Sequence, residues 1–357
     1  CIADDPMCMV NLAGNDEFLY LKEDLKEMLF RERRDQEDPR MFGRGDIFEE
    51  YEYADKKTHN FYNRYMAGCN WSNPGSPYDF RYDKTIVFCE DIDHAERMRQ
   101  AGLHVPEVIA QDLEQGFLLL EDLGSTDYLS VLTSDNVESL YADATAALLR
   151  LQSNGLVVGL PPYDRALLLR EMQLFPDWLL GTHLGLALTA AEREMLDQVF
   201  EVLIDNALAQ PVVCVHRDYH SRNLMLREVN NPGVIDFQDA VAGPVTYDLV
   251  SLLRDCYVRW PGERVDAWVA EYYRAAHAAG LLVGVDEAGF LEWFDLMGVQ
   301  RHLKAAGIFA RLNHRDAKPG YLADIPRTLG YIVEVGKRRA EVAPLAEFIE
   351  SKVLQNL

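Results

Sequence analysis

The chain has 357 residues, 48% of them hydrophobic, and a formal net charge of −23. This length allows two lobes, because single hydrophobic cores rarely grow beyond about 250–300 residues. No apolar run approaches the roughly 20 residues of a membrane span, and so acidic a chain is a poor partner for the phosphates of nucleic acid. We therefore expect a soluble protein that binds neither membranes nor nucleic acid.

The start of the sequence and the cysteines bear on location. Cys1 and Ile2 are followed by Asp4 and Asp5, so the start lacks the basic and apolar segments of a secretory signal. The six cysteines are scattered and form no C-x-x-C pair, which indicates reduced thiols. Both features favour a cytoplasmic location, and neither predicts an oligomeric state.

The first eighty residues give few structural signals. Residues 22–40 are densely charged, and residues 73–77 (NPGSP) are rich in turn formers. Gly43 and Gly45 lack the third glycine and the preceding strand of a phosphate-binding loop, so we interpret them as a surface turn.

Clearer signals begin near residue 84. Residues 85–88 (TIVF) predict a strand, and a helix is expected over residues 95–101, stopped by Gly102. Residues 117–120 (FLLL) predict a second strand that ends in a turn at residues 121–124. This pattern suits a strand that leads into a connector between lobes.

Two amphipathic helices are predicted next. Apolar residues at helical spacing over 137–151 indicate a helix that starts at Asp135 and ends near residues 154–155. Thr189 and Glu192 form a capping-box pattern at the start of the second helix. Both helices precede the residues that carry chemistry.

Two short strands, residues 212–215 and 233–235, follow, and the rest of the chain is predicted to be helical. We expect an α+β, two-lobed fold with its active site in the cleft between the lobes. Residues 1–123 would form a small mixed nucleotide-binding lobe, divergent over residues 1–80. Residues 124–357 would form a larger, mainly helical lobe for catalysis and substrate binding.

The decisive motif lies between the two short strands. His216 to Asn223 reads H-R-D-x-x-x-x-N, and Asp236-Phe237 follows thirteen residues after the asparagine. These patterns match the catalytic loop and the metal-binding D-F-x element of the protein-kinase fold. Phosphoryl transfer needs a base at the acceptor hydroxyl and oxygen ligands for magnesium. Asp218 is the expected base, and Asn223 and Asp236 are the expected Mg²⁺ ligands; unrelated turn caps are the less favoured alternative.

The sequence resembles the aminoglycoside phosphotransferase and choline kinase superfamily, whose fold is protein-kinase-like. The matching stretches are residues 102–106, 116–124, 215–219, 234–240, 243–248, 296–304 and 321–326. Within that superfamily the likeness is greatest to bacterial amino-sugar kinases of cell-wall recycling, which phosphorylate the anomeric hydroxyl of N-acetylmuramate and N-acetylglucosamine. The resemblance implies ATP and Mg²⁺ as cofactors and an amino sugar as substrate.

The resemblance also implies roles for residues around the motif. Asp218 is the catalytic base, and His216 belongs to the same catalytic motif. His220 acts either near the transferred phosphate or by orienting the loop, and both interpretations stay open. We expect Asp248 to brace the loop from a helix start, where carboxylates are favourable, and not to touch substrate.

The same resemblance implies that the strand from Phe117 to Glu121 contacts the adenine through its backbone, with Leu120, Glu121 and Asp122 as the expected nucleotide-binding residues. Many kinases place a lysine for the nucleotide phosphates on the central strand of the small lobe, but the strand predicted here contains none. Arg81 or Lys84, at the entrance of that strand, is the expected substitute.

Four basic residues, Arg301, Lys304, Arg311 and Arg315, fall on one face of a helix predicted near the C-terminus. The preferred interpretation is a solvated face whose charges pair with nearby carboxylates. If the face meets the acceptor instead, we expect Arg301 or Arg311 to bind the lactyl carboxylate that N-acetylmuramate has and N-acetylglucosamine lacks.

Several alternatives remain at the level of sequence. Tyr163, Phe175 and Trp178 suit stacking on a sugar, although a place in the hydrophobic core is the safer prediction. Aminoglycosides, choline and other small alcohols are alternative acceptors, and the net negative charge favours a cationic one. A pseudokinase that binds nucleotide without turnover is the rival from another class. The indistinct first eighty residues favour it, and the complete catalytic motif argues against it.

Overall fold

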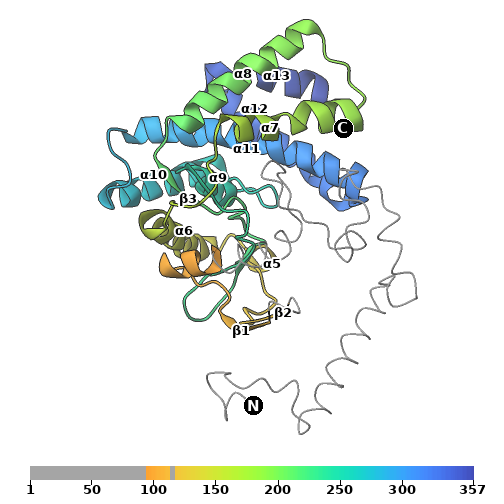
Figure 1. Ribbon diagram of the computed structural model, residues 1–357. Coiled ribbons are helices and arrows are strands. Elements are labelled where there is room, and N and C mark those ends of the chain that lie inside the picture. Colours follow the sequence, from red (N-terminus) through yellow and green to blue (C-terminus); the bar gives the residue numbers. More distant parts are fainter. Residues whose placement is uncertain (1–93, 113–116) are drawn as a thin grey trace, which may run out of the picture. The chain divides into compact units, whose positions relative to one another are not determined.

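The computed structural model describes residues 94–112 and 117–357 (Figure 1). The chain divides into two compact units, one of which contains the antiparallel strands β1 (Val108–Asp112) and β2 (Phe117–Leu120). The other contains residues 94–107 and 121–357. Strand β2 confirms the prediction for residues 117–120, whereas the strand predicted at residues 85–88 lies outside the described residues.

The described part of the larger unit starts with helical residues 94–100, followed by Gly102 at φ +90°. The sequence predicted this helix over residues 95–101, with Gly102 as its stop. Helix α6 (Val137–Asn154) ends before Gly155, also as predicted. Its predicted start at Asp135 is wrong, because the residue that precedes the helix is Asn136. The side chain of Asn136 accepts a hydrogen bond from the Thr133 N–H at 2.8 Å, which fixes the turn before the helix.

The remaining elements of this unit are mostly helical. The α-helices are α5 (Tyr128–Val131), α7 (Arg165–Met172), α8 (Ala190–Leu208), α9 (Tyr247–Leu253), α10 (Gly262–Ala278), α11 (Glu287–Asp316), α12 (Ile325–Gly336) and α13 (Ala343–Phe348). The π- and 3₁₀-helical segments are η4 (Phe175–His183), η5 (Pro319–Asp324), η6 (Ala340–Val342) and η7 (Ile349–Val353). The capping box at the start of α8 is confirmed, with reciprocal hydrogen bonds between Thr189 and Glu192.

Four short strands hold the predicted motif. Strand β3 (Val212–Val215) pairs antiparallel with β6 (Val241–Pro244), and β4 (Leu224–Met225) pairs antiparallel with β5 (Gly233–Val234). The sequence predicted β3 and β5 but missed β4 and β6, so the expectation of only helices after residue 235 is wrong at β6. A two-residue strand and one that contains Gly and Pro give little strand signal.

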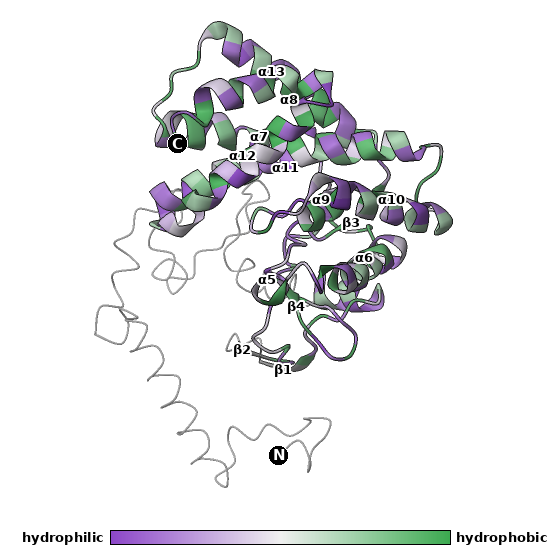
Figure 2. Cartoon of the chain, turned by 180° about the vertical axis from the view of Figure 1, so that it is seen from behind, coloured by the Kyte–Doolittle hydropathy of each residue, from purple (hydrophilic) through white to green (hydrophobic). Residues whose placement is uncertain are grey.

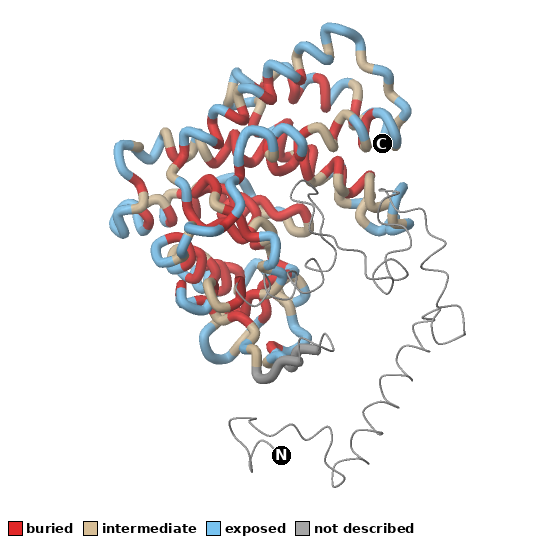
Figure 3. The backbone as a smooth tube through the Cα atoms, viewed as in Figure 1, coloured by how far each residue is buried: buried red, intermediate tan, exposed pale blue. Residues whose placement is uncertain are grey.

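The long helix α11 forms the centre of the larger unit and contacts α7, α8, α9, α10 and α12. Its buried residues run from Phe290 to Ala310, the red middle section in Figure 3. The surrounding helices carry both hydrophobic and hydrophilic residues, as Figure 2 shows. Burial of their apolar faces on α11 stabilises the unit by roughly 25 cal/mol per Å² of apolar surface removed from water.

Two further findings concern the expectations from composition. Among the helices of residues 94–112 and 117–357, none combines the length and the apolar composition that a membrane span requires. Cys214 and Cys256 are free and buried, which confirms the expected thiol state for these two cysteines.

Candidate active site

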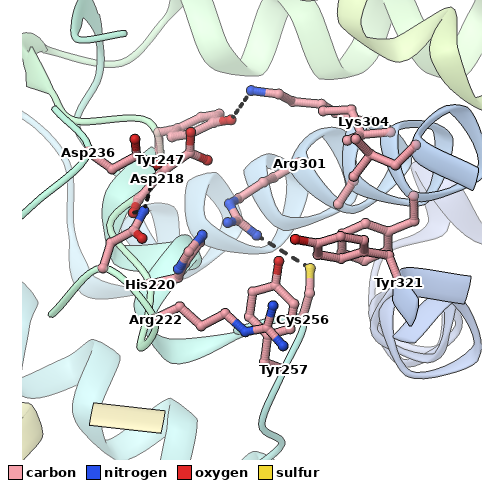
Figure 4. Close-up of a pocket in the computed structure, with 15 residues that line it drawn as sticks. Asp218, His220, Arg222, Asp236, Tyr247, Cys256, Tyr257, Arg301, Lys304 and Tyr321 are labelled. Atoms are coloured by element: carbon pink, nitrogen blue, oxygen red, sulfur yellow. Dashed lines mark hydrogen bonds between the residues drawn. The ribbon is translucent and has the colours of Figure 1, made fainter. Parts of the chain in front are cut away.

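The loop between β3 and β4 carries the H-R-D-x-x-x-x-N motif, and Asp236 follows β5. Asp218, Asn223 and Asp236 line one cavity of about 360 Å³ (Figure 4). The other lining residues are His220, Arg222, Tyr247, Cys256, Tyr257, Arg301, Lys304, Ala305, Ile308, Phe309, Leu312 and Tyr321. The loop and α11 therefore form opposite parts of the lining, although they are separated by more than sixty residues in the sequence.

The backbone of the motif is strained at two positions. Arg217 has φ +76° and Asp236 has φ +67°, in the left-handed region that non-glycine residues seldom adopt. Such conformations cost on the order of 1–3 kcal/mol and persist only where the surroundings fix them. At Arg217 the N–H donates to the Asp248 carboxylate at 3.0 Å. The strain lies at the two segments that carry the expected base and metal ligand.

Asp248, on the first turn of α9, braces the loop as the sequence predicted. Its carboxylate accepts hydrogen bonds from the N–H groups of His216 (2.7 Å) and Arg217 (3.0 Å). Burial raises the pKa of Asp248 to about 7, against the opposing effect of these two donors. Its side chain is fully buried and does not line the cavity.

Replacing Asp248 with asparagine is expected to loosen this brace. The Asp248→Asn side chain keeps one acceptor oxygen but turns an NH₂ group toward a backbone N–H, so the free energy of unfolding should fall by about 2–3 kcal/mol. Urea unfolding measures this change, with Asp197→Asn on the exposed side of α8 as a matched control. Equal stability of the two variants would contradict the bracing role.

Asn223 and Asp236 lie side by side next to Asp218, the expected base. The Asn223 amide donates to the backbone carbonyl of Asp218 at 3.0 Å and to the Asp236 carboxylate at 3.2 Å. Gln238 donates to the other oxygen of Asp236 at 2.6 Å. One carboxylate and one amide oxygen at the edge of a cavity are a donor set that suits Mg²⁺, which takes few protein ligands and completes its shell with phosphates and water.

The charge of Asp218 is set by its neighbours. Burial raises its pKa, but the positive charge of Lys304 and, more weakly, of other basic side chains including Arg301 outweighs burial and lowers the pKa overall. Asp218 is therefore a carboxylate at neutral pH and can accept a proton.

The two histidines of the motif occupy different environments. His216 is fully buried outside the cavity lining, and its Nδ1 accepts a hydrogen bond from the Asp218 N–H at 3.3 Å. His220 lines the cavity and meets the ring of Tyr257 edge-on at 5.4 Å between centroids. His220 thus lies in the cavity lining together with Asp218, and His216 lies outside that lining.

The imidazole of His216 should remain neutral well below neutral pH. Burial lowers its pKa to about 4, so its neutral form is favoured by folding. The resulting stability is complete above pH 6.5 and is lost as the pH falls toward 4, by roughly 3 kcal/mol. Burial also raises the pKa of Asp248, whose effect on stability has the opposite sign in this range. NMR titration of the His216 ring resolves the two groups, and a midpoint near 6.5 would contradict the prediction.

Sequence reasoning missed Glu171, a buried carboxylate of α7. It forms a salt bridge with Arg217 of the motif and another with Lys304 of α11, the latter at 3.0 Å. Lys304 also donates to the Tyr247 hydroxyl at 2.9 Å. The sequence did contain a signal for this residue, because Glu171 lies on the same apolar helix face as Leu168. A carboxylate on a buried face is rarely left without a cationic partner.

The basic face predicted on α11 divides into two pairs. Arg301 and Lys304 are buried and line the cavity, so the interpretation of a solvated face is wrong for both. Arg315 is exposed and pairs with Asp316 at 2.8 Å, which confirms that interpretation at this position. Arg311 is partly buried and does not belong to the lining.

An aromatic wall faces the catalytic loop. The ring centroids of Tyr257 and Phe309 lie 6.2 Å apart, and Phe309 stacks on Tyr321 at 5.6 Å. The guanidinium of Arg222 lies over the Tyr257 ring, 3.8 Å from its centroid. Such a wall suits the apolar face of a sugar ring.

The three aromatic residues considered from sequence lie elsewhere. Tyr163 and Phe175 are buried in the core, and Trp178 packs against it. This outcome confirms the safer of the two predictions.

The expected nucleotide residues are described only in part. Arg81 and Lys84 lie outside the described residues, and Leu120 is exposed. The Glu121 N–H donates to the Glu107 carbonyl at 2.8 Å, and its carboxylate contacts His104 at 3.1 Å. The Asp122 carboxylate accepts from the Gly124 N–H at 2.7 Å. The adenine contact of this segment remains a prediction.

Comparison with known proteins gives results at three levels. Residues 92–287 match the model of the phosphotransferase enzyme family. The chain is 53% identical over 258 residues to the N-acetylmuramate/N-acetylglucosamine kinase of Pseudomonas putida, covering 72% of this chain and 75% of that one. It is 47% identical over 247 residues to the kinase of the same name from Neisseria meningitidis serogroup B, covering 68% and 74%. Among solved structures, a choline kinase from Streptococcus pneumoniae matches with a TM-score of 0.49 at 12% identity, covering 71% of this chain and 83% of that one.

Proposed function

Because this chain belongs to the phosphotransferase enzyme family, we propose that it transfers a phosphoryl group from magnesium-bound ATP to the anomeric hydroxyl of N-acetylmuramate and N-acetylglucosamine. The observation that carries this proposal is the meeting of Asp218, Asn223 and Asp236 in one cavity. The names of the similar kinases support the choice of acceptor. In the cell the reaction would serve the recycling of cell-wall amino sugars.

The proposed chemistry assigns one task to each part of the cavity. Asp218, ionised at neutral pH, accepts the proton of the anomeric hydroxyl as its oxygen attacks the terminal phosphorus. His216 holds the loop through the Asp218 N–H and acts as a positioning residue. The aromatic wall of Tyr257, Phe309 and Tyr321 packs against the sugar.

Asn223 and Asp236 would hold Mg²⁺ in this proposal. The ion, when bound, neutralises charge on the phosphate oxygens. The Asp218 carbonyl fixes the Asn223 amide, and Gln238 fixes the Asp236 carboxylate, so both ligands are oriented by hydrogen bonds. The nucleotide base is assigned to the backbone at residues 120–122, with Arg81 or Lys84 near its phosphates.

The charges of the cavity argue against a cationic acceptor such as an aminoglycoside or choline. Arg222, Arg301 and Lys304 line it, whereas its carboxylates, Asp218 and Asp236, are assigned to the proton and the metal. The net charge of −23 is therefore not concentrated at this site. A pseudokinase is disfavoured because all three catalytic and metal-binding side chains are present in one cavity.

Incubation with Mg²⁺, ATP and a panel of sugars and amino alcohols tests the function. Phosphorus NMR should detect a sugar 1-phosphate, whose phosphorus couples to the anomeric proton, from both amino sugars. The Asp218→Asn protein serves as the control for background hydrolysis. Absence of any phosphorylated sugar, or a product phosphorylated at another hydroxyl, would overturn the proposal.

A further inference from the structure

We propose that two arginines of the cavity divide the anionic groups of the reaction between them. Buried Arg301 binds the phosphoryl group during transfer, and exposed Arg222 binds the carboxylate of an acidic sugar. This inference rests on the proposed function and deepens it, because it assigns the group that distinguishes the two acceptors to one side chain. The less favoured interpretation of the sequence, that the basic face meets the acceptor, assigned that carboxylate to Arg301 or Arg311.

Arg301 is a buried cation whose partners are incomplete. Its side chain is 6% exposed, its NH1 group contacts the Cys256 sulfur at 3.6 Å, and its Nε has no hydrogen-bond partner. Within the described part of the chain, no carboxylate forms a salt bridge with it. Figure 4 shows its guanidinium pointing from α11 toward His220, in the part of the cavity that contains Asp218. Lys304, one turn further along, does have a carboxylate partner, Glu171, which it shares with Arg217.

The degree of burial of each arginine indicates which anion it binds. An unpaired charge taken out of water is destabilising by several kcal/mol, whereas an exposed cation loses almost nothing when its partner is absent. The phosphoryl group is present in every catalytic cycle, but the lactyl carboxylate is present only with N-acetylmuramate. A buried arginine reserved for the carboxylate would be unpaired whenever the neutral sugar is bound. Arg301 therefore suits the anion that both reactions share.

Arg222 has the properties expected for the optional anion. It is exposed and lines the same cavity, and its guanidinium carbon lies over the Tyr257 ring, 3.8 Å from the ring centroid. A cation–π contact with the ring uses none of the guanidinium N–H donors, so these remain available to bind a carboxylate with two hydrogen bonds. The Tyr321 ring, with its centroid 5.8 Å from the guanidinium, extends the same surface.

The transfer step needs no reactant other than the sugar and ATP. The anomeric oxygen forms a bond to the γ-phosphorus, the bond from phosphorus to the bridging oxygen of ADP breaks, and the hydroxyl proton passes to Asp218. Arg301 donates hydrogen bonds to the non-bridging oxygens as charge spreads over them. Arg222 forms no bond that changes in this step, so it contributes binding and not rate.

Kinetics of Arg301 variants on both sugars test the first half of the inference. Arg301→Gln should lower kcat by about 100- to 1,000-fold on both acceptors alike, the range seen for removal of one preorganised donor. Arg301→Lys keeps the positive charge, so its kcat and its stability should lie between those of Arg301→Gln and those of the wild type. The dissociation constant of the ADP–aluminium fluoride complex, which mimics the transferring phosphoryl group, should rise for Arg301→Gln. A loss confined to N-acetylmuramate, or unchanged binding of that complex, would overturn the assignment.

Arg222→Gln tests the second half and does not depend on a buried substitution. It should raise the KM for N-acetylmuramate about tenfold or more and leave N-acetylglucosamine nearly unchanged, as expected for loss of a charge-assisted pair. Arg315→Gln, at an exposed site of α11 outside the cavity lining, is the matched control and should alter neither sugar. Equal effects of Arg222→Gln on both sugars, or no effect on either, would refute the assignment.

Failure of the proposed function and failure of the assignment of the two arginines give different results. If the wild-type protein phosphorylates neither amino sugar, the proposed function is wrong. If it phosphorylates both and the Arg222 and Arg301 variants show the opposite selectivity, only the division between the arginines is wrong.

Discussion

Asp218→Asn should reduce kcat by roughly 100- to 10,000-fold, the usual contribution of a general base. An amide of the same shape cannot accept the proton of the acceptor hydroxyl. The fold should survive, because the hydrogen bonds of residue 218 that hold the loop are made by its backbone N–H and carbonyl. Steady-state rates with N-acetylglucosamine measure the loss of activity. Thermal unfolding measures the stability of the variant, and titration with ATP measures its affinity for the nucleotide.

A neighbouring carboxylate provides the control for this substitution. Asp239 is exposed, lies outside the cavity lining and is only loosely paired with Arg217, at 3.8 Å. Asp239→Asn should retain nearly the full rate. If Asp218→Asn kept most of the wild-type rate, or if both variants lost it equally, Asp218 would not be the base.

Asp236→Ala should lose the magnesium-dependent part of ATP binding. Removal of the carboxylate deletes a metal ligand, and the affinity for Mg–ATP should fall by at least about 10- to 100-fold, the range for disturbing even the outer partners of a metal site. Binding of ATP in the presence of EDTA should be almost the same as in the wild type. Calorimetric titration with and without Mg²⁺ separates the two contributions.

The backbone at this position requires a second variant. Asp236 has φ +67°, which alanine adopts with strain, whereas asparagine tolerates the left-handed region. Asp236→Asn thus removes the charge without the strain and should show the same direction of change. An unchanged affinity for Mg–ATP in both variants would exclude Asp236 as a metal ligand.

The meeting of Asp218, Asn223 and Asp236, the proposed base and metal ligands, could be predicted from sequence because it is local. Asp218 and Asn223 belong to one eight-residue loop, and Asp236 follows a strand thirteen residues later. Spacing within such a short segment fixes the distances between side chains once the flanking strands pair. The Thr189 capping box was predictable for the same reason, since both hydrogen bonds connect residues three apart.

The strand pairings show where local signals are too weak. Strand β6 contains glycine and proline, and its pairing with β3 depends on residues that lie some thirty positions away. The start of α6 was misplaced by one residue because the Asn136 side chain bonds backward to Thr133. Propensity alone does not distinguish such competing local hydrogen bonds.

The part of the cavity formed by α11, where we propose that the acceptor binds, was decided only by tertiary structure. The sequence determined that Arg301, Lys304, Arg311 and Arg315 share one face of a helix, but helical spacing does not tell which part of that face is buried. Packing of α11 against α7 and α9 buries Arg301 and Lys304 and leaves Arg315 in solvent. The sequence alone tells which side chains carry a charge. Whether that charge must find a partner depends on its removal from water, which only the packing of distant segments brings about.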